Sequence, residues 1–284
     1  MTDIATGNQQ ALTDLRGKID AIDGEVHELL IDRAAVIDSL VRIKGTSVAA
    51  NAFRPGREAA MMHRLVADHR GALPITTVEH IWREIITTFT RLQARFDVVI
   101  DASLEPEWMR DLARFHFGFS VNVDSMPDAH AVVARVAENG DLGIVGLDTP
   151  QSARAWWRRL IGRPAPKIMA HLPFILVPDR PADVRAVVIA PPLGEPTEPD
   201  LKMFAVSSSS PVTTAPGIAV LASQQNGDEW DTLVAVNADL DEAGFAARAA
   251  AGVTDVIEVG GLFRGIAVDT PPSLLYAGLG EADR

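Results

Sequence analysis

The sequence contains no cysteine, which excludes disulfides, thiolate metal sites, iron–sulfur clusters and cysteine nucleophiles. Glycine and proline are also modest, with 21 and 18 residues among 284, while 47% of the residues are hydrophobic. This composition excludes a collagenous, low-complexity or disordered chain. The length is typical of a globular protein with two domains.

Positive charge is scarce as well. The chain has 26 Lys and Arg against 38 Asp and Glu, and a net charge of −12 argues against nucleic-acid binding through phosphate neutralisation. The deficit is uneven, because residues 1–104 hold 12 basic and 14 acidic residues, a net of −2, which leaves −10 for the rest. We therefore expect the N-terminal third to supply the cations for any small anionic ligand.

Several further patterns are missing. The first ten residues lack a basic stretch followed by an apolar core, so no secretory signal and a cytoplasmic location are expected. The longest uncharged run, residues 203–227, contains consecutive serines, prolines and glutamines, which excludes a membrane helix. His-Glu-x-x-His, Gly-x-Ser-x-Gly and dinucleotide-binding patterns are absent, and the sequence predicts neither a metal nor a cofactor.

The first hundred residues are predicted to be helical. Apolar residues recur at alternating spacings of three and four, with one arginine among them: Leu12, Leu15, Ile19, Ile22, Val26, Leu29, Arg33, Val36, Leu40 and Ile43. A helix from Gln10 to Lys44 would be roughly 50 Å long, which requires a partner helix along its face. A second helix is expected from Pro55 to about Arg70, and a third from Thr76 to Val99, with Glu79 completing a capping box.

From about Leu104 the pattern changes to short β-rich runs separated by Pro, Gly and Asp. Strands are expected at 117–123, 142–147, 168–177, 185–189, 202–206, 218–222, 232–236, 256–259 and 262–268, and helices at 108–115, 129–138, 151–161 and 242–251. The sequence thus predicts an α+β protein, with an all-helical domain at 1–102 followed by an α/β-type domain at 103–284.

Arg33 is the first candidate site residue, because a buried cation in an apolar seam requires an anion. Lys44, eleven residues later, returns to within roughly 20° of the same helix face. Both residues together suit an anionic ligand. The alternative is that Arg33 pairs with a carboxylate across an interface and Lys44 only solvates the helix end.

A second group of candidates lies at the start of the helix beginning at Pro55. Glu58 suits the positive end of the helix dipole, whereas Arg54 and Arg57 oppose it, as expected if this helix end faces an anion. An exposed helix start with loosely placed charges is the alternative. Gln93, one turn after Phe89, is expected to place an amide toward the bundle interior, although its spacing alone is a weak signal.

These residues carry a family resemblance. The chain reads Leu15-Arg16-x-x-Ile19-Asp20-x-Ile22-Asp23, Leu29-Leu30-x-x-Arg33, Lys44, Arg54-Pro55-x-Arg57-Glu58, and Ile81-Trp82-Arg83-Glu84-Ile85-Ile86 with Gln93. In order and spacing this resembles the all-helical chorismate mutases over residues 8–100. The resemblance implies an intertwined helical homodimer that rearranges chorismate to prephenate, in aromatic amino-acid biosynthesis, without a cofactor.

The resemblance also implies roles for single residues. Arg33 and Arg16 of the partner subunit would bind the two substrate carboxylates, Lys44 and Gln93 would face the ether oxygen, and Glu58 would accept a hydrogen bond from the ring hydroxyl, with Arg57 at the border. Arg54 and Phe89 depart from some family members, which have an acidic and a small polar residue there. The residue types fit a unimolecular rearrangement, which needs a clamp for the reactive conformer and donors for developing charge.

The C-terminal region gives less information. Residues 139–145 are faintly similar to a lobe of prephenate dehydratases, but the Thr-Arg-Phe signature of that site is absent, and a degenerate dehydratase-like or a regulatory role stays open. All candidate residues precede Leu104, so the C-terminal domain is expected to be dispensable for the rearrangement. Two other functions compete: an isochorismate pyruvate lyase on the same fold, and a non-catalytic regulatory protein that binds a metabolite.

Overall fold

The computed structural model describes residues 2–44, 53–103, 105–147, 155–178, 180, 183–193, 198–249 and 252–268. Contacts divide the chain into two compact units, Met1–Ser47 and Val48–Arg284. The first unit contains one helix, and the second contains every other described element. None of the described helices is both long and apolar enough to cross a membrane.

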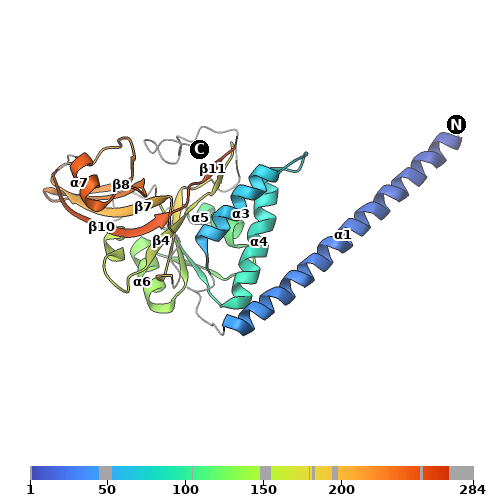
Figure 1. Ribbon diagram of the computed structural model, residues 1–284, viewed down its shortest axis with the longest axis horizontal. Helices are drawn as coiled ribbons and strands as arrows, with labels where there is room; N and C mark the ends of the chain where they lie inside the picture. The colour runs from blue at the N-terminus through green and yellow to red at the C-terminus, as the bar shows by residue number, and fades with distance from the viewer. Residues whose placement is uncertain are drawn as a thin grey trace. The chain divides into compact units, whose positions relative to one another are not determined.

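Helix α1 (Thr2–Lys44) has 43 residues, which corresponds to about 65 Å, and begins eight residues before the expected start (Figure 1). No proline interrupts it. Its apolar seam is exposed, with fractions of 48% to 67% at Leu12, Leu15, Ile19, Ile22, Val26, Leu29 and Val36. Long helices owe most of their stability to packing of an apolar face, and an exposed apolar stripe of this length is typical of an interaction surface.

The second unit begins with two consecutive helices, α3 (Pro55–Asp68) and α4 (Ile75–Gln93). They contact each other and lie side by side in Figure 1. Pro55 occupies the first turn of α3, as predicted. The predicted capping box of α4 is wrong: Pro74 is the N-cap and makes no side-chain cap, while Glu79 is buried. The predicted end at Val99 is also wrong, because strand β1 (Val98–Asp101) follows.

A βαβαβ arrangement comes next, formed by β1, α5 (Pro106–Phe117), β2 (Val123–Met126), α6 (Ala129–Asn139) and β3 (Leu142–Gly146). Strand β1 lies between β2 and β3 and pairs with both in parallel. Helix α6 starts at Asp128, whose carboxylate accepts a hydrogen bond from the Ala131 N–H, and ends at Gly140 in the left-handed region. These caps fix the crossover that places β3 beside β1.

The remaining described elements are η1 (Trp156–Leu160), β4 (Lys167–Leu172), β5 (Ile175–Leu176), β6 (Ala186–Ala190), β7 (Leu201–Ser208), β8 (Ile218–Asn226), β9 (Glu229–Asn237), α7 (Glu242–Ala249), β10 (Val253–Leu262) and β11 (Ile266–Ala267). They complete a nine-stranded mixed sheet of order β2-β1-β3-β6-β4-β10-β7-β9-β8. Strands β5 and β11 form a separate parallel pair. The α+β class is confirmed.

Several predicted strands differ from those observed. The strand expected at 117–123 is wrong for most of its length, because α5 continues to Phe117 and β2 begins only at Val123. The runs at 168–177 and 262–268 divide into separate strands. In the first run, Pro173 lacks the N–H needed to continue the ladder. The helix expected at 151–161 is described only as η1, since residues 151–154 lie outside the described part.

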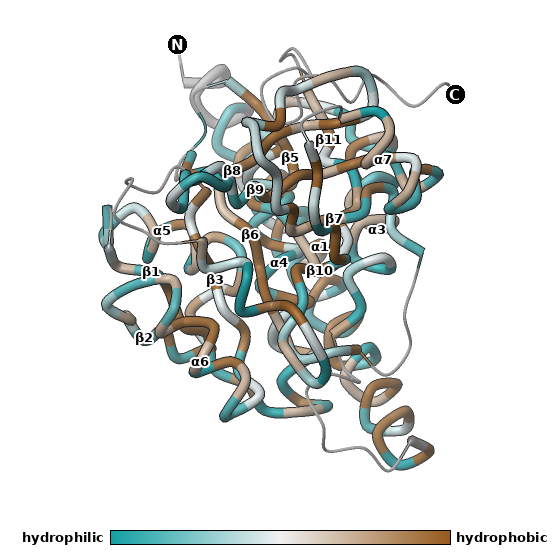
Figure 2. The backbone as a smooth tube through the Cα atoms, turned by 90° about the vertical axis from the view of Figure 1, so that its left-hand side faces the viewer, coloured by the Kyte–Doolittle hydropathy of each residue, from teal (hydrophilic) through white to brown (hydrophobic). Residues whose placement is uncertain are grey.

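Both faces of the large sheet are covered by helices, so its strands are strongly hydrophobic, as Figure 2 shows for β6. Along β7, Met203 and Ala205 share a core with α6 and η1, whereas Phe204 and Val206 pack with α7. At the other end of the sheet, α5 packs on β1, β3 and β6. This alternation is the two-residue period of a strand buried on both sides.

Helices α3 and α4 share their core with the β5–β11 pair. Ala59 and Met62 are buried against Phe174 and Ile175, and residues of α4 and β11 pack around them. Phe53, which precedes α3, joins the core beneath α5. The domain boundary predicted at residue 102 therefore lies inside the second unit, whose first residue is Val48. That residues 1–102 form a separate domain stays a prediction.

Candidate active site

The first three candidate residues lie on α1. Arg16 is exposed and Arg33 is half-buried, and their separation of seventeen residues corresponds to about 25 Å along the helix. Lys44 is the last residue of α1, and its side chain lies outside the described part of the structure. Arg16 and Arg33 of one chain are therefore too far apart to hold the same small dicarboxylate.

Arg57 and Glu58 lie in the first turn of α3. Arg57 is exposed, whereas the Glu58 side chain is only 14% exposed. Successive residues of a helix point about 100° apart, so one side chain faces outward and the other faces α4. Arg57 and Glu58 were both expected to contact the substrate, but Arg57 faces solvent. Of the two, only Glu58 belongs to a buried network.

Glu58 forms an ion pair with Arg83 of α4, with 3.1 Å between Oε2 and Nη1. Burial raises the pKa of Glu58, against the lowering effects of the Arg83 charge, the Arg83 hydrogen bond and the backbone of Arg54. Arg83 itself is 4% exposed at its side chain, and its Nε has no partner among the described residues. A guanidinium left partly unpaired in the interior is costly and marks a polar site.

A second ion pair lies deeper in the same region. Arg180 Nη1 is 3.4 Å from Glu79 Oε2, both side chains are 1% exposed, and the arginine also donates to the carbonyl of Ile175. Burial raises the pKa of Glu79 and lowers that of Arg180, and in each case the partner's charge opposes the shift. The pair connects α4 to the segment after β5, 101 residues away in sequence.

Two buried histidines complete the network, His116 of α5 and His171 of β4. Burial lowers the pKa of His171 to about 4 and that of His116 well below its usual value, and the Arg83 charge adds to both shifts. Both imidazoles are therefore neutral at pH 7. Each of the two glutamates is paired with an arginine, which is how a cluster of buried ionisable groups avoids an uncompensated charge.

A small cavity lies at the centre of this network. Its wall contains Glu58, Arg83, His116 and His171 together with apolar residues of α3, β4 and the adjoining loops. Its volume is about 20 Å³, which is large enough to hold one water molecule. In this state of the single chain the cavity is polar on one side and too small for a dicarboxylate with a six-membered ring.

Gln93 occupies the last position of α4. Its Nε2 donates to the Phe89 carbonyl at 3.0 Å, one turn back on the same helix, and this is its hydrogen bond within the described part of the chain. Phe89 is buried. To donate to a ligand, the Gln93 amide must exchange this bond for a new one.

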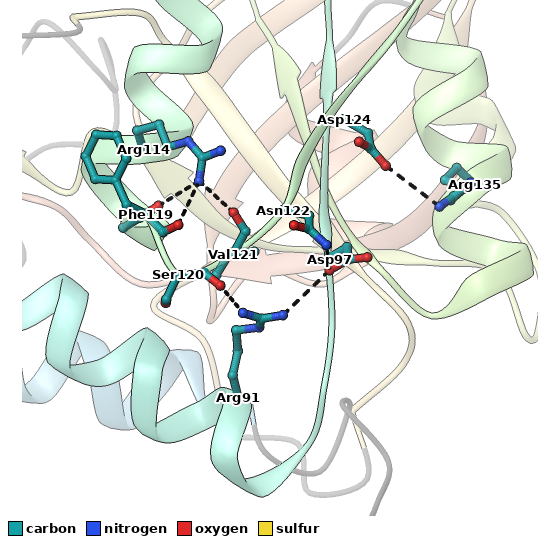
Figure 3. Close-up of polar contacts among 10 residues, drawn as sticks. Arg91, Asp97, Arg114, Phe119, Ser120, Val121, Asn122, Asp124 and Arg135 are labelled. Atoms are coloured by element: carbon teal, nitrogen blue, oxygen red, sulfur yellow. Dashed lines mark hydrogen bonds and ion pairs between the residues drawn. The ribbon is translucent and has the colours of Figure 1, made fainter.

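The end of α4 is held by arginine contacts to the loop after α5 (Figure 3). Arg91 donates to the Ser120 carbonyl and lies 3.8 Å from Asp97, which precedes β1. Arg114 of α5 donates to the Val121 carbonyl at 2.6 Å, which fixes the same loop. The position of Gln93 is thereby tied to the sheet.

Comparison with known proteins gives matches to one family and to two curated relatives. Residues 15–94 match chorismate mutase type II. A bifunctional chorismate mutase/prephenate dehydratase of Neisseria gonorrhoeae is 29% identical over 114 residues, 39% of this chain and 30% of that protein. One of the same name from Pseudomonas aeruginosa is 29% identical over 148 residues, 50% of this chain and 40% of that protein. No solved structure matches the chain.

We refer to residues 15–94 as the mutase-like segment. It contains every candidate residue from Arg16 to Gln93 and covers most of α1 with all of α3 and α4. The Pseudomonas match is longer than this segment and so extends beyond it. The chain spans 30% and 40% of the two curated relatives.

Glu58 was predicted as a site residue, but the buried polar network around it was not predicted from the sequence. A signal was present, because the buried residues Glu79, Arg83, Thr87 and Thr90 of α4 recur at spacings of four, four and three, the period of one helix face. A polar stripe with this period normally indicates a solvated face. Here Ile81 and Leu92 are exposed instead, about half of each side chain, and the polar stripe faces the interior.

Proposed function

We propose that this protein is a chorismate mutase that rearranges chorismate to prephenate. The observation that carries the proposal is that the mutase-like segment contains the complete set of candidate residues, in order, on α1, α3 and α4. The set has arginines for carboxylates, a lysine and a glutamine as donors, and a carboxylate as acceptor. Arginine binds carboxylates through paired, charge-assisted hydrogen bonds.

The reaction needs no nucleophile and moves no proton between enzyme and substrate. The ether C–O bond of chorismate breaks while a C–C bond forms in the same molecule, so catalysis depends on holding the reactive conformer and stabilising charge on the ether oxygen. Arg33 and Arg16 of the partner subunit would bind the carboxylates. Lys44 and Gln93 would donate to the ether oxygen, and Glu58 would accept from the ring hydroxyl.

The active form is proposed to be a homodimer. The exposed seam of α1 supports this, because an apolar stripe of this length is suited to another helix. The 25 Å between Arg16 and Arg33 of one chain supports it as well, since two antiparallel copies of α1 would bring Arg16 of the partner subunit to Arg33.

The deciding experiment is an assay of chorismate disappearance with identification of the product. Prephenate supports the mutase, whereas formation of salicylate and pyruvate from isochorismate, with chorismate left unchanged, would support the lyase. Binding of the substrate without turnover would support a regulatory protein. Dehydratase activity is not part of the proposal, because the Thr-Arg-Phe signature is absent from the sequence.

A site that combines Arg33 of one subunit with Arg16 of the other predicts a specific result for mixed dimers. Arg16→Ala and Arg33→Ala homodimers should each lose nearly all turnover, yet a mixed dimer should regain one complete site. Equal amounts of the two variants are combined under conditions that allow subunit exchange, and chorismate turnover is measured. Exchange verified by mass-tagged subunits without recovered turnover would rule out the shared site.

A further inference from the structure

Glu58 is surrounded by ionisable groups from each element packed against it. Arg83 contributes a cation from α4, and neutral His116 and His171 face the same cavity from α5 and β4. On its own helix, Arg57 points to solvent. Arg83 is thus the cation that directly opposes the effect of burial on the Glu58 carboxylate.

Arg83 is held on its other sides by groups outside the mutase-like segment. Its guanidinium lies 5.8 Å from the centre of the Phe174 ring, in the segment between β4 and β5. One turn earlier on α4, Glu79 is fixed by Arg180. Arg83 and Phe174 line the same cavity, so the C-terminal region contributes part of the wall beside this arginine.

We propose that Arg83 is a positioning residue for the rearrangement, which holds Glu58 as an ionised and oriented acceptor for the substrate hydroxyl. This inference rests on the proposed function. It adds Arg83, which is not among the substrate-binding residues proposed above. A carboxylate offers about four lone-pair positions. The bonds to Arg83 and to the Arg54 backbone leave about two of these positions for further donors, and they orient the carboxylate toward them.

The test compares pH profiles of kcat/KM for the full-length wild type and Arg83→Gln. Removal of the cation leaves only the Arg54 backbone to oppose the effect of burial, so the pKa of Glu58 rises further and the acid limb moves to higher pH. We expect kcat/KM to fall about 10- to 100-fold at neutral pH, as for a misplaced catalytic group, and to recover in part at alkaline pH. An unchanged profile would overturn the proposal.

Two matched variants separate positioning from structure. Arg180→Gln removes a buried arginine from the same network without touching Glu58, and it should lower stability while leaving the acid limb in place. Arg83→Lys keeps the charge but lacks the planar fork, so it should lower kcat/KM with little movement of the limb. If Arg83→Gln does not fold, an Arg83→Lys enzyme with wild-type kcat/KM overturns the proposal.

A double-mutant cycle with Glu58→Gln shows whether Arg83 acts through Glu58. In the Glu58→Gln background, Arg83→Gln should change kcat/KM by no more than about twofold, because the group it positions is gone. A full additional loss would mean that Arg83 acts elsewhere. A wild type that converts no chorismate refutes the proposed function itself, whereas an active wild type with additive losses refutes only the role of Arg83.

Discussion

Gly118 ends α5 with φ at 72°, and the Glu84 carboxylate of α4 lies where its Cβ would be. The same carboxylate accepts a hydrogen bond from the Phe119 N–H at 3.1 Å. Only a residue without a side chain satisfies both the left-handed backbone and this close approach. A single glycine therefore connects the helix carrying Gln93 to the loop that leads into β2.

Gly118→Ala should lower the free energy of unfolding by about 1–2 kcal/mol for the backbone and roughly 1 kcal/mol more for the displaced Glu84 bond. Gly71→Ala is the control, because Gly71 has φ at 90° and no atom within 4 Å of its Cβ position, so only the backbone cost applies. Urea unfolding of both variants measures the difference. Equal losses would show that the Glu84 contact contributes nothing.

His171 predicts a pH dependence of stability. Its folded-state pKa of about 4 lies below the usual 6.5, so between these values the unfolded chain binds a proton that the folded chain does not, and stability falls as pH falls through this window. Glu58 and Glu79 act in the opposite direction, because their pKa values are raised and the folded chain holds those protons more tightly.

Replacing His171 isolates its contribution. We expect His171→Gln to flatten the decline in unfolding free energy between about pH 6.5 and pH 4, by a total of up to about 3 kcal/mol. Urea titrations at half-unit pH steps, with the wild type as reference, measure this difference. Parallel curves for the two proteins would show that His171 does not remain neutral in the folded state.

At the scale of elements, α1 and α4 differ from the usual amphipathic helix in opposite ways. Helix α1 has an apolar seam that is exposed in the single chain, whereas α4 buries polar and charged residues. An exposed apolar seam has a free-energy reason to associate, at about 25 cal/mol per Å² of apolar surface removed from water. The charges on the buried face are paired instead, Arg83 with Glu58 and Glu79 with Arg180.

Ile22→Glu should therefore dissociate the proposed dimer and reduce chorismate turnover, because it places a charge in the middle of the seam. Ala21→Glu is the matched control, since Ala21 is also exposed but lies about 100° away from Ile22 on the helix. Sedimentation equilibrium of both variants gives the association state. A dimer that persists in Ile22→Glu would place the interface elsewhere.

At the scale of the whole molecule, the second unit joins α3 and α4 to the β5–β11 pair through a shared core and to the segment after β5 through an ion pair. Phe174 and Ile175 pack on α3, and Arg180 neutralises Glu79. The sequence led us to expect that residues after Leu104 are dispensable. The packing changes this expectation, because removing one partner of a buried ion pair costs about 3–5 kcal/mol.

A chain ending at Asp101 should accordingly lose the structure of α3 and α4, since Glu79 would be left without Arg180 and Met62 without Phe174. Far-UV circular dichroism and the fluorescence of Trp82, the tryptophan of α4, report this loss. The full-length chain is the reference. A truncated chain that is folded, dimeric and active would contradict the prediction and make the helical segment self-sufficient.

The sequence by itself determined the elements whose signals are local. Pro55 starts α3, and the expected helix at 129–138 and strands at 142–147, 185–189 and 232–236 correspond to α6, β3, β6 and β9. It also determined the mutase-like segment, because that resemblance depends on residue types at fixed spacings. These features need only short-range information, such as backbone preferences, caps and periodicity.

Only the tertiary structure decided where α4 stops and which of its faces is buried. Val98 and Val99 suit a helix seam as well as a strand, and they join β1 because β2 and β3 supply hydrogen-bond partners on both sides. Glu79 and Arg83 look like surface charges until Arg180 and Glu58 are seen beside them. A buried charge is stabilised by partners distant in sequence, and no local pattern contains those partners.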